Sequence, residues 1–310
     1  MPILDDYMDE DMAYLTGLII ARGTLEASPQ RRLIISFPKS DLEATGISTH
    51  FKQDTSIKLG LTVIRERIAE LLATDVQTVP QANSVDLVVM FLRNSMAWRN
   101  ILTITEQQTS YQHYRVPKIF FEQSIPQEWK RQFVRGYGDA AGNVRKANLY
   151  VNGLHRVRLD TLNYPTNWAV PVQLCTLLQE HLDIPVHLIT WGHPNMHREF
   201  REHQLNIFAD EYLKIGFSFE HKQKILEELA NFNLKHGSAS PPKKCPGIRA
   251  IHRKESDSEE GNASKLDPRL VGKHFDGYWQ ICKALGCTRM PPDDGQGTLE
   301  FVEDAEKPEH

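Results

Sequence analysis

Basic side chains gather in one part of the chain, accompanied there by a single acid, Asp139. The basic residues between positions 130 and 158 are Lys130, Arg131, Arg135, Arg145, Lys146, Arg156 and Arg158. Such a cluster could neutralise phosphate groups, although a run of charge is more commonly a solvated surface. Arg156 and Arg158 stand two residues apart, so in a strand both would point to one face. The cluster by itself leaves both interpretations open.

Three cysteines near the end of the chain could hold a metal ion. Cys245, Cys282 and Cys287, together with His274 or His252, offer the four thiolate or imidazole ligands that tetrahedral zinc takes. Their spacing contains one Cx4C pair and isolated further members, rather than two CxxC knuckles. A structural zinc site is therefore one hypothesis, and ordinary buried helix cysteines are the other.

The elements that must position these groups occur twice in the same order. Apolar residues at three- and four-residue steps predict helices, and short β-rich runs predict strands. In the first half the predicted helices cover residues 12–26, 57–72 and 96–104, and the strands cover 32–39, 78–80 and 85–92. In the second half the helices cover 127–138, 170–182 and 221–231, and the strands cover 186–190 and 204–209. A hairpin over 149–159, turning at Asn152 and Gly153, completes the repeat.

Two nine-residue segments with one pattern open the two halves. They are LTGLIIARG at 15–23 and VRGYGDAAG at 134–142, and their closing glycines lie 119 residues apart (142 − 23). Small residues four apart form a bare stripe on a helix, which lets a second helix backbone approach closely. The small residues are Gly17, Ala21 and Gly23 in the first segment and Gly136, Ala140 and Gly142 in the second.

These segments resemble the two signature helices of the LAGLIDADG family, known mainly for homing endonucleases. The resemblance extends over residues 9–231. It implies an α+β fold of two αββαββα halves, related by a pseudo-twofold axis, whose signature helices pack face to face. In the family the two sheets form a saddle in the major groove of duplex DNA. The expected domains are the first half at 9–110 and the second half at 111–233.

The composition changes after the second half. Residues 234–265 are rich in Gly, Ser, Pro, Lys and Glu, which predicts a linker or mobile loop. Apolar spacing returns over 266–289 and predicts a small helical module, and the acidic stretch 290–310 is expected to be disordered.

The chain departs from the family at the positions that carry its chemistry. Family members hold divalent metal with an acid just before the final glycine of each signature helix, and here these positions are Arg22 and Ala141. The signature acid that remains is Asp139, whose counterpart in the first segment is Ile20. Carboxylates are the ligands that Mg²⁺ needs, so the usual nuclease site is expected to be absent. Arg22 could contact a DNA phosphate, or it could pair with an acid on a neighbouring strand.

The function that the resemblance implies is recognition of an asymmetric duplex DNA site by a single chain. The residues expected to contact DNA are Arg22, Arg32, Lys39, Arg145, Lys146, Arg156 and Arg158. One alternative is a Mg²⁺-dependent endonuclease of the homing or restriction type with a relocated metal site, for which Asp139 is the candidate catalytic acid. A second alternative is an RNA maturase, which would bind structured RNA.

Composition limits the other classes of function. The 310 residues include 36 basic and 40 acidic side chains, for a net charge of −4, so the whole-chain charge gives no sign of nucleic-acid binding. Apolar residues make up 40%, as in folded globular proteins, and no apolar run is long enough to span a bilayer. Four cysteines imply no disulfide framework, so we expect a cytoplasmic protein. We expect a monomer, with both halves carried by one chain.

Overall fold

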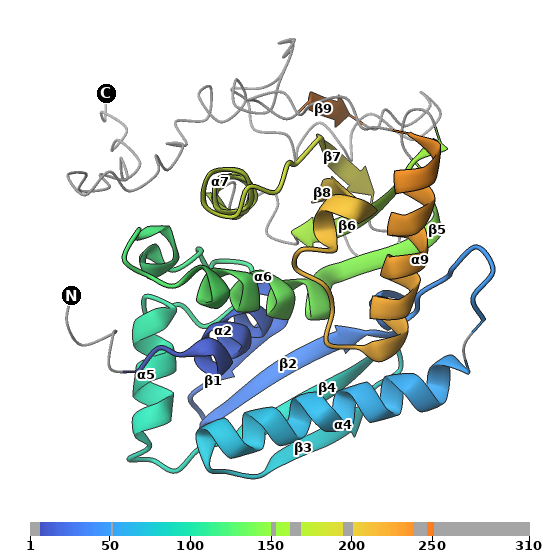
Figure 1. Cartoon of the computed structure of the whole chain (residues 1–310). Helices are drawn as coiled ribbons and strands as arrows, with labels where there is room; N and C mark the ends of the chain where they lie inside the picture. Colours follow the sequence, from blue (N-terminus) through green and yellow to red (C-terminus); the bar gives the residue numbers. More distant parts are fainter. Residues whose placement is uncertain are drawn as a thin grey trace, which may run out of the picture.

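The computed structural model describes residues 7–50, 52–149, 153–161, 169–194, 201–237 and 247–250. Within these residues the chain forms two α+β halves, each with a sheet built on four antiparallel strands and with helices packed on its inner face (Figure 1). No helix of the described part is long and apolar enough to cross a membrane. The predicted fold class is confirmed.

The first half has the predicted αββαββα order, with one short extra helix. Its helices are α2 (Glu10–Arg22), α3 (Lys39–Leu42), α4 (Gln53–Leu72) and α5 (Met96–Ile104), and its strands are β1 (Gly23–Glu26), β2 (Arg32–Pro38), β3 (Val76–Pro80) and β4 (Ser84–Met90). The sheet order is β1-β2-β4-β3, all antiparallel. Along β2, buried Leu33, Ile35 and Phe37 alternate with half-buried residues, which gives the sheet an inner and an outer face.

The second half repeats this arrangement. After the 3-10 turn η1 (Lys118–Phe121), its helical elements are α6 (Gln127–Ala141), α7 (Ala169–Thr176), the π-helical turn η3 (Leu177–His181), α8 (Ala209–Tyr212) and α9 (Glu220–His236). Its strands are β5 (Gly142–Leu149), β6 (His155–Thr161), β7 (Leu188–Pro194), β8 (Arg201–Phe208) and β9 (Gly247–Ala250). The sheet order β5-β6-β8-β7 matches that of the first half, and β9 adds a fifth strand beside β7.

The two halves meet through α2 and α6, which cross at the centre of the molecule (Figure 1). A Cβ atom at Gly17 would lie 2.0 Å from the backbone oxygen of Phe133, and one at Gly136 would lie 2.1 Å from that of Tyr14. Phe133 and Tyr14 each stand three residues before the glycine of their own helix. The contact is therefore reciprocal, as a pseudo-twofold axis requires, and only glycine permits such close backbones.

Two boundary predictions were wrong in the same way. Residues 23–26 were expected to continue the first helix and form β1 instead, while β5 begins at Gly142 rather than near residue 149. In both halves the closing glycine ends the signature helix with an extended backbone, at φ −81° for Gly23 and −94° for Gly142. The four-residue β1 is too short to show a strand period, and β5 carries polar side chains in place of a clear apolar alternation. The turn residue Asn152 lies outside the described residues.

Replacing Gly17 or Gly136 with alanine should lower the free energy of unfolding by about 3 kcal/mol, because a methyl group would push the two helix backbones apart. Urea denaturation measures the change. Gly153→Ala is the control, since nothing lies within 4 Å of its added Cβ and its φ of +74° alone costs about 1 kcal/mol. Equal losses at all three positions would contradict the close contact.

Candidate nucleic-acid interface

Arg22 and Ala141 stand at the positions expected to hold metal from the resemblance to the LAGLIDADG family, and they lie at the C-terminal ends of α2 and α6. Arg22 is 3% exposed, and its Nη2 lies 3.1 Å from Oδ2 of Asp41 on α3. Ala141, at the equivalent end of α6, is fully buried. Of the two roles considered for Arg22, the observed one is the ion pair with an acid, although the acid sits on a short helix rather than a strand. A buried guanidinium in that pair is not presented to a DNA backbone.

Asp139 also lies inside the protein, and its carboxylate is engaged by neighbouring donors. The Tyr14 hydroxyl donates to Oδ2 at 2.7 Å, and the Ser218 backbone N–H lies 3.0 and 3.2 Å from the two carboxylate oxygens. Asp139 is 1% exposed, and this desolvation raises the pKa of the carboxyl above its usual value. A carboxylate so placed links the two halves through Tyr14, and its oxygens are already engaged by donors of the protein.

Lys222 of α9 places a second cation at the same end of α6. Its Nζ donates to the backbone oxygens of Asp139 at 3.2 Å and Gly142 at 3.0 Å, and so caps carbonyl groups that the end of the helix leaves without helical partners. The rings of Phe217 and Phe219 lie 5.3 and 5.4 Å from it. Complete burial lowers the pKa of Lys222 to about 8, against the opposing effect of Asp139.

Lys222 was not among the functional residues predicted from the sequence. A signal was present, because Ile225, Leu226 and Leu229 follow Lys222 at steps of three, four and seven and are buried with it on one face of α9. A lysine on the apolar face of a helix indicates either a pairing partner or a functional group. Nothing local identifies the partner, since Asp139 lies 83 residues away.

Several residues of the basic cluster are used inside the fold. Lys130 is buried and donates to the backbone oxygen of Glu122 at 2.6 Å. Arg135 donates to the backbone oxygen of Ile215 at 2.9 Å, and Arg131 forms a half-exposed ion pair with an acid of its own helix. These three cations stabilise α6 and its surroundings, so the local excess of charge is larger than the charge available to a ligand.

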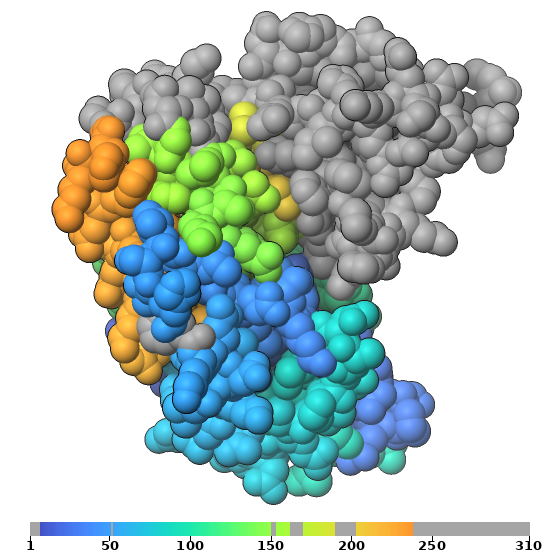
Figure 2. Space-filling model, turned by 90° about the vertical axis from the view of Figure 1, so that its right-hand side faces the viewer, coloured from blue at the N-terminus to red at the C-terminus, as the bar shows by residue number. Residues whose placement is uncertain are grey.

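Exposed cations remain where the first half meets β5. Thr45 of the loop after α3 forms a bridge with Arg145, and the Lys146 N–H donates to the Thr45 backbone oxygen at 2.7 Å. Arg145 also donates to the Ser40 backbone oxygen, next to Lys39. Lys39 and Lys146 are exposed and Arg145 is half-buried. Figure 2 shows the same junction, with the first half (blue) directly against β5 and β6 (green). The structure thus brings together three predicted contact residues from both halves.

The other predicted contact residues lie on the outer faces of the two sheets. Arg156 and Arg158 alternate with the fully buried Val157 and Leu159, so both arginines point away from the core. Arg156 is nonetheless only 7% exposed. Arg32, on the outer face of β2, is paired with the Glu26 carboxylate of β1.

The two outer faces differ in chemistry. On the second sheet, Arg158 pairs in register with Asn143 on one side and Asn206 on the other, and Gln204 lies opposite Asp160. Arginine, asparagine and glutamine are the side chains that form paired hydrogen bonds with base edges. The outer face of the first sheet carries the Arg32–Glu26 pair, Asp86 and the apolar side chains Ile34, Val88 and Met90.

No metal centre is found in the described part of the chain, where no three His, Cys, Asp or Glu side chains converge. The zinc hypothesis concerns Cys245, Cys282, Cys287 and His274, all of which lie outside the described residues. The fourth cysteine, Cys175, is buried in the core.

Asp139→Asn and Lys222→Met should each lower the free energy of unfolding by about 3 kcal/mol, because each leaves a buried partner without its compensating charge or hydrogen bonds. The loss of unfolding free energy in the double variant should be at least about 1 kcal/mol smaller than the sum of the two single losses, as for any coupled pair. Urea denaturation of the four proteins gives this coupling. Additive losses would show that Asp139 and Lys222 act independently.

Comparison with known proteins gives a loose likeness in fold. No protein-family model and no curated protein sequence matches the chain. A structure of the homing endonuclease I-DmoI in complex with its target DNA in the presence of Mg²⁺ is 18% identical over 69% of this chain and 96% of that chain, with a TM-score of 0.37. Full-length DUF199/WhiA from Thermatoga maritima is 14% identical over 74% of this chain and 62% of its own, with a TM-score of 0.41.

The N-terminal LAGLIDADG domain of DUF199/WhiA is 12% identical over 71% of this chain and 80% of that domain structure, with a TM-score of 0.37. Because these identities and TM-scores are low, the assignment depends on the chain's own architecture. Two αββαββα halves with equivalent sheet orders, joined by a reciprocal pair of glycine-bearing helices, give this protein a LAGLIDADG-like fold.

Proposed function

We propose that this chain is a duplex DNA-binding protein that recognises an asymmetric site through the major groove and does not cut it by the usual LAGLIDADG route. The observation that carries the proposal is the reciprocal packing of Gly17 and Gly136, which fixes two unlike sheets on either side of one axis. A groove-binding surface assembled from two such sheets can contact two successive half-sites.

The cations at the junction of the halves supply the phosphate contacts. Lys39, Arg145 and Lys146 come from α3 and β5, so together they span the line along which a DNA backbone would cross from one half to the other. Each phosphate that a cation neutralises adds about 0.9 to the salt dependence of binding. Arg32, Arg156 and Arg158 stand farther out on the sheet faces, with Arg156 the most buried of the three.

Sequence discrimination belongs mainly to the second half. Its outer face carries the half-buried Arg158 and Asn143 side by side, whereas the first sheet presents a neutralised arginine and apolar groups. Asn206, on the other side of Arg158, is 1% exposed, and its amide donates to the Leu188 backbone oxygen. Hydrogen bonds from the second sheet would select bases, and apolar side chains of the first sheet would contact thymine methyl groups. Because the outer faces of the two sheets differ, we expect the two halves of the DNA site to differ as well.

The helix ends support binding without cleavage. Arg22 stands where a metal-binding carboxylate would be needed, and two unit charges 4 Å apart at an effective dielectric of 20 interact by about 4 kcal/mol. Ala141 offers no ligand, and the Asp139 carboxylate is buried among donors. Mg²⁺ would be needed only if phosphodiester chemistry survived elsewhere, and no observation favours the relocated nuclease site or the maturase role.

Replacing both Lys39 and Lys146 with alanine should weaken binding to duplex DNA and lower the slope of log Kobs against log salt by about 2, since two phosphate contacts are lost. Fluorescence anisotropy of a labelled random-sequence duplex from 50 to 300 mM salt measures both effects. The matched control is Arg99→Ala with Lys235→Ala, exposed cations on α5 and α9, which should leave the slope unchanged. A flat salt response in the unmodified protein would exclude phosphate-driven binding.

Bound duplex should remain intact in Mg²⁺ or Mn²⁺, because Arg22 and Ala141 provide no carboxylate to bind the metal ion at the helix ends. Gel analysis of a duplex pool after incubation with protein and metal, beside a sample containing EDTA, reports cleavage. Double-strand breaks that appear with metal and disappear with EDTA would revive the relocated-site alternative. Asp139→Asn would then test whether Asp139 takes part.

A further inference from the structure

The two sheets differ at one edge. Strand β3 closes one end of the first sheet, and its counterpart in the second half is β7. A further strand, β9, covers the outer edge of β7 in parallel register, from Leu188 opposite Gly247 to Trp191 opposite Ala250. Within the described part of the chain no strand covers β3. An open edge presents unpaired backbone donors and acceptors and readily accepts an added strand.

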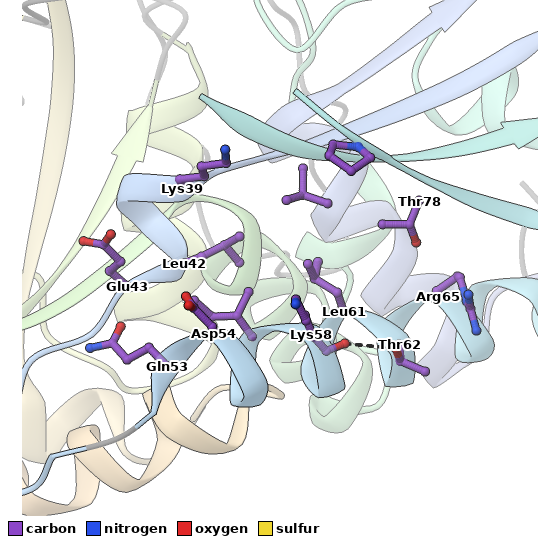
Figure 3. A pocket seen from close by; sticks show the side chains of 13 residues that line it. Lys39, Leu42, Glu43, Gln53, Asp54, Lys58, Leu61, Thr62, Arg65 and Thr78 are labelled. Carbon is purple, nitrogen blue, oxygen red and sulfur yellow. Dashed lines mark hydrogen bonds between the residues drawn. The ribbon is translucent and has the colours of Figure 1, made fainter. Parts of the chain in front are cut away.

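A groove runs beside this open edge, between β3 and α4 (Figure 3). Its volume is about 800 Å³. The apolar lining consists of Leu42, Ile57, Leu61, Pro80 and Val85. Three cations, Lys39, Lys58 and Arg65, lie along its rim. The groove therefore suits a ligand that carries both apolar and acidic groups.

The charges of the groove favour an acidic ligand. Two acids also line it, but the Glu43 carboxylate lies 3.8 Å from Arg145, and Asp54 occupies the first turn of α4, where a helix favours negative charge. Among the described residues, no acid lies within ion-pair distance of Lys58. Lys58 is exposed and available to a carboxylate from outside.

The dimensions of the groove favour an extended ligand. Its α4 side runs from Ile57 to Arg65, eight residue steps that span about 12 Å at 1.5 Å per residue. Four residues of a strand cover about the same distance. Thr78 and Pro80 of β3 line the opposite side. Pro80 has no N–H, so strand pairing would use the preceding residues of β3.

We propose that the edge of β3 and this groove receive the chain's own segment 298–304, TLEFVED, as an added strand. In an extended conformation Leu299, Phe301 and Glu303 share one face, which places two apolar side chains over the groove floor and a carboxylate at its cationic rim. The segment carries three acids and no base, which complements the three rim cations.

Chain length permits this contact within one molecule. Sixty-two residue steps separate the end of α9 at His236 from Thr298 (298 − 236), and a chain of that length reaches about 200 Å when extended. Segment 298–304 lies outside the described residues, and the proposal concerns its sequence and the surface that would receive it. The groove shares Lys39 with the proposed phosphate contacts, so the tests below change Lys58, which lines the groove and is not among the proposed DNA contacts.

The first test is hydrogen exchange on the full-length chain. The Thr78 amide of β3 points away from β4, because hydrogen-bonded pairs alternate along the two strands from Gln81 and Ser84. This amide should exchange at least tenfold more slowly in the unmodified protein than in the variant Leu299→Asp/Phe301→Asp, because the added strand protects it. Exchange in β7, whose edge is already paired with β9, serves as the internal control. Equal exchange of β3 in the two proteins would overturn the proposal.

The second test uses a fluorescent peptide of residues 296–306 as the probe. It should bind the full-length Leu299→Asp/Phe301→Asp variant with a micromolar Kd, and the unmodified chain at least tenfold more weakly, because the tethered segment competes for the same groove. Adding Lys58→Glu to that variant should weaken peptide binding about tenfold, whereas adding Lys235→Glu, at the exposed end of α9, should not. Absence of peptide binding, or equal binding to both chains, would overturn the proposal.

Discussion

The close contact of two helix backbones at Gly17 and Gly136 is the constraint on which the rest of this structure depends. At this distance each helix presents a backbone carbonyl where the other has no side chain, an arrangement that favours weak Cα–H···O contacts and allows the surrounding side chains to interlock. The helices are short and most of their residues are buried, so neither half could leave its signature helix in water. The pairing therefore fixes the positions of the two sheets.

Burial of the helix pair determines what its ends can do. Two buried cations near the helix ends have partners from other parts of the fold. Arg22 pairs with Asp41, and Lys222 donates to backbone carbonyl groups at the end of α6. Desolvation makes such groups costly unless they are paired, and pairing removes them from any chemistry with an external phosphate. The helix ends therefore contain internal cations, while half-buried Arg158 and Asn143 lie on the outer face of the second sheet.

Features encoded over short stretches could be predicted from the sequence. The small-residue stripes, the repeated order of elements and the helix at 96–104 are expressed by local periodicity, and the structure has them. Partners distant in the sequence could not be predicted: Ser218 and Lys222 reach Asp139 across 79 and 83 residues, and no spacing rule connects them. The number of cations that the basic cluster presents to a ligand was overestimated, because Lys130 and Arg135 donate hydrogen bonds to backbone carbonyl groups inside the fold. Local composition shows that charge is present, but tertiary contacts decide which charges face outward.

Selection from a random-sequence duplex library, with retained and cut molecules counted in one incubation with Mg²⁺, decides whether the protein binds a specific duplex without cutting it. We expect enrichment of intact duplexes that share a site with two dissimilar halves, the more strongly specified half corresponding to the second sheet. Failure to enrich any sequence above the starting pool, at salt low enough to permit phosphate contacts, would contradict this expectation.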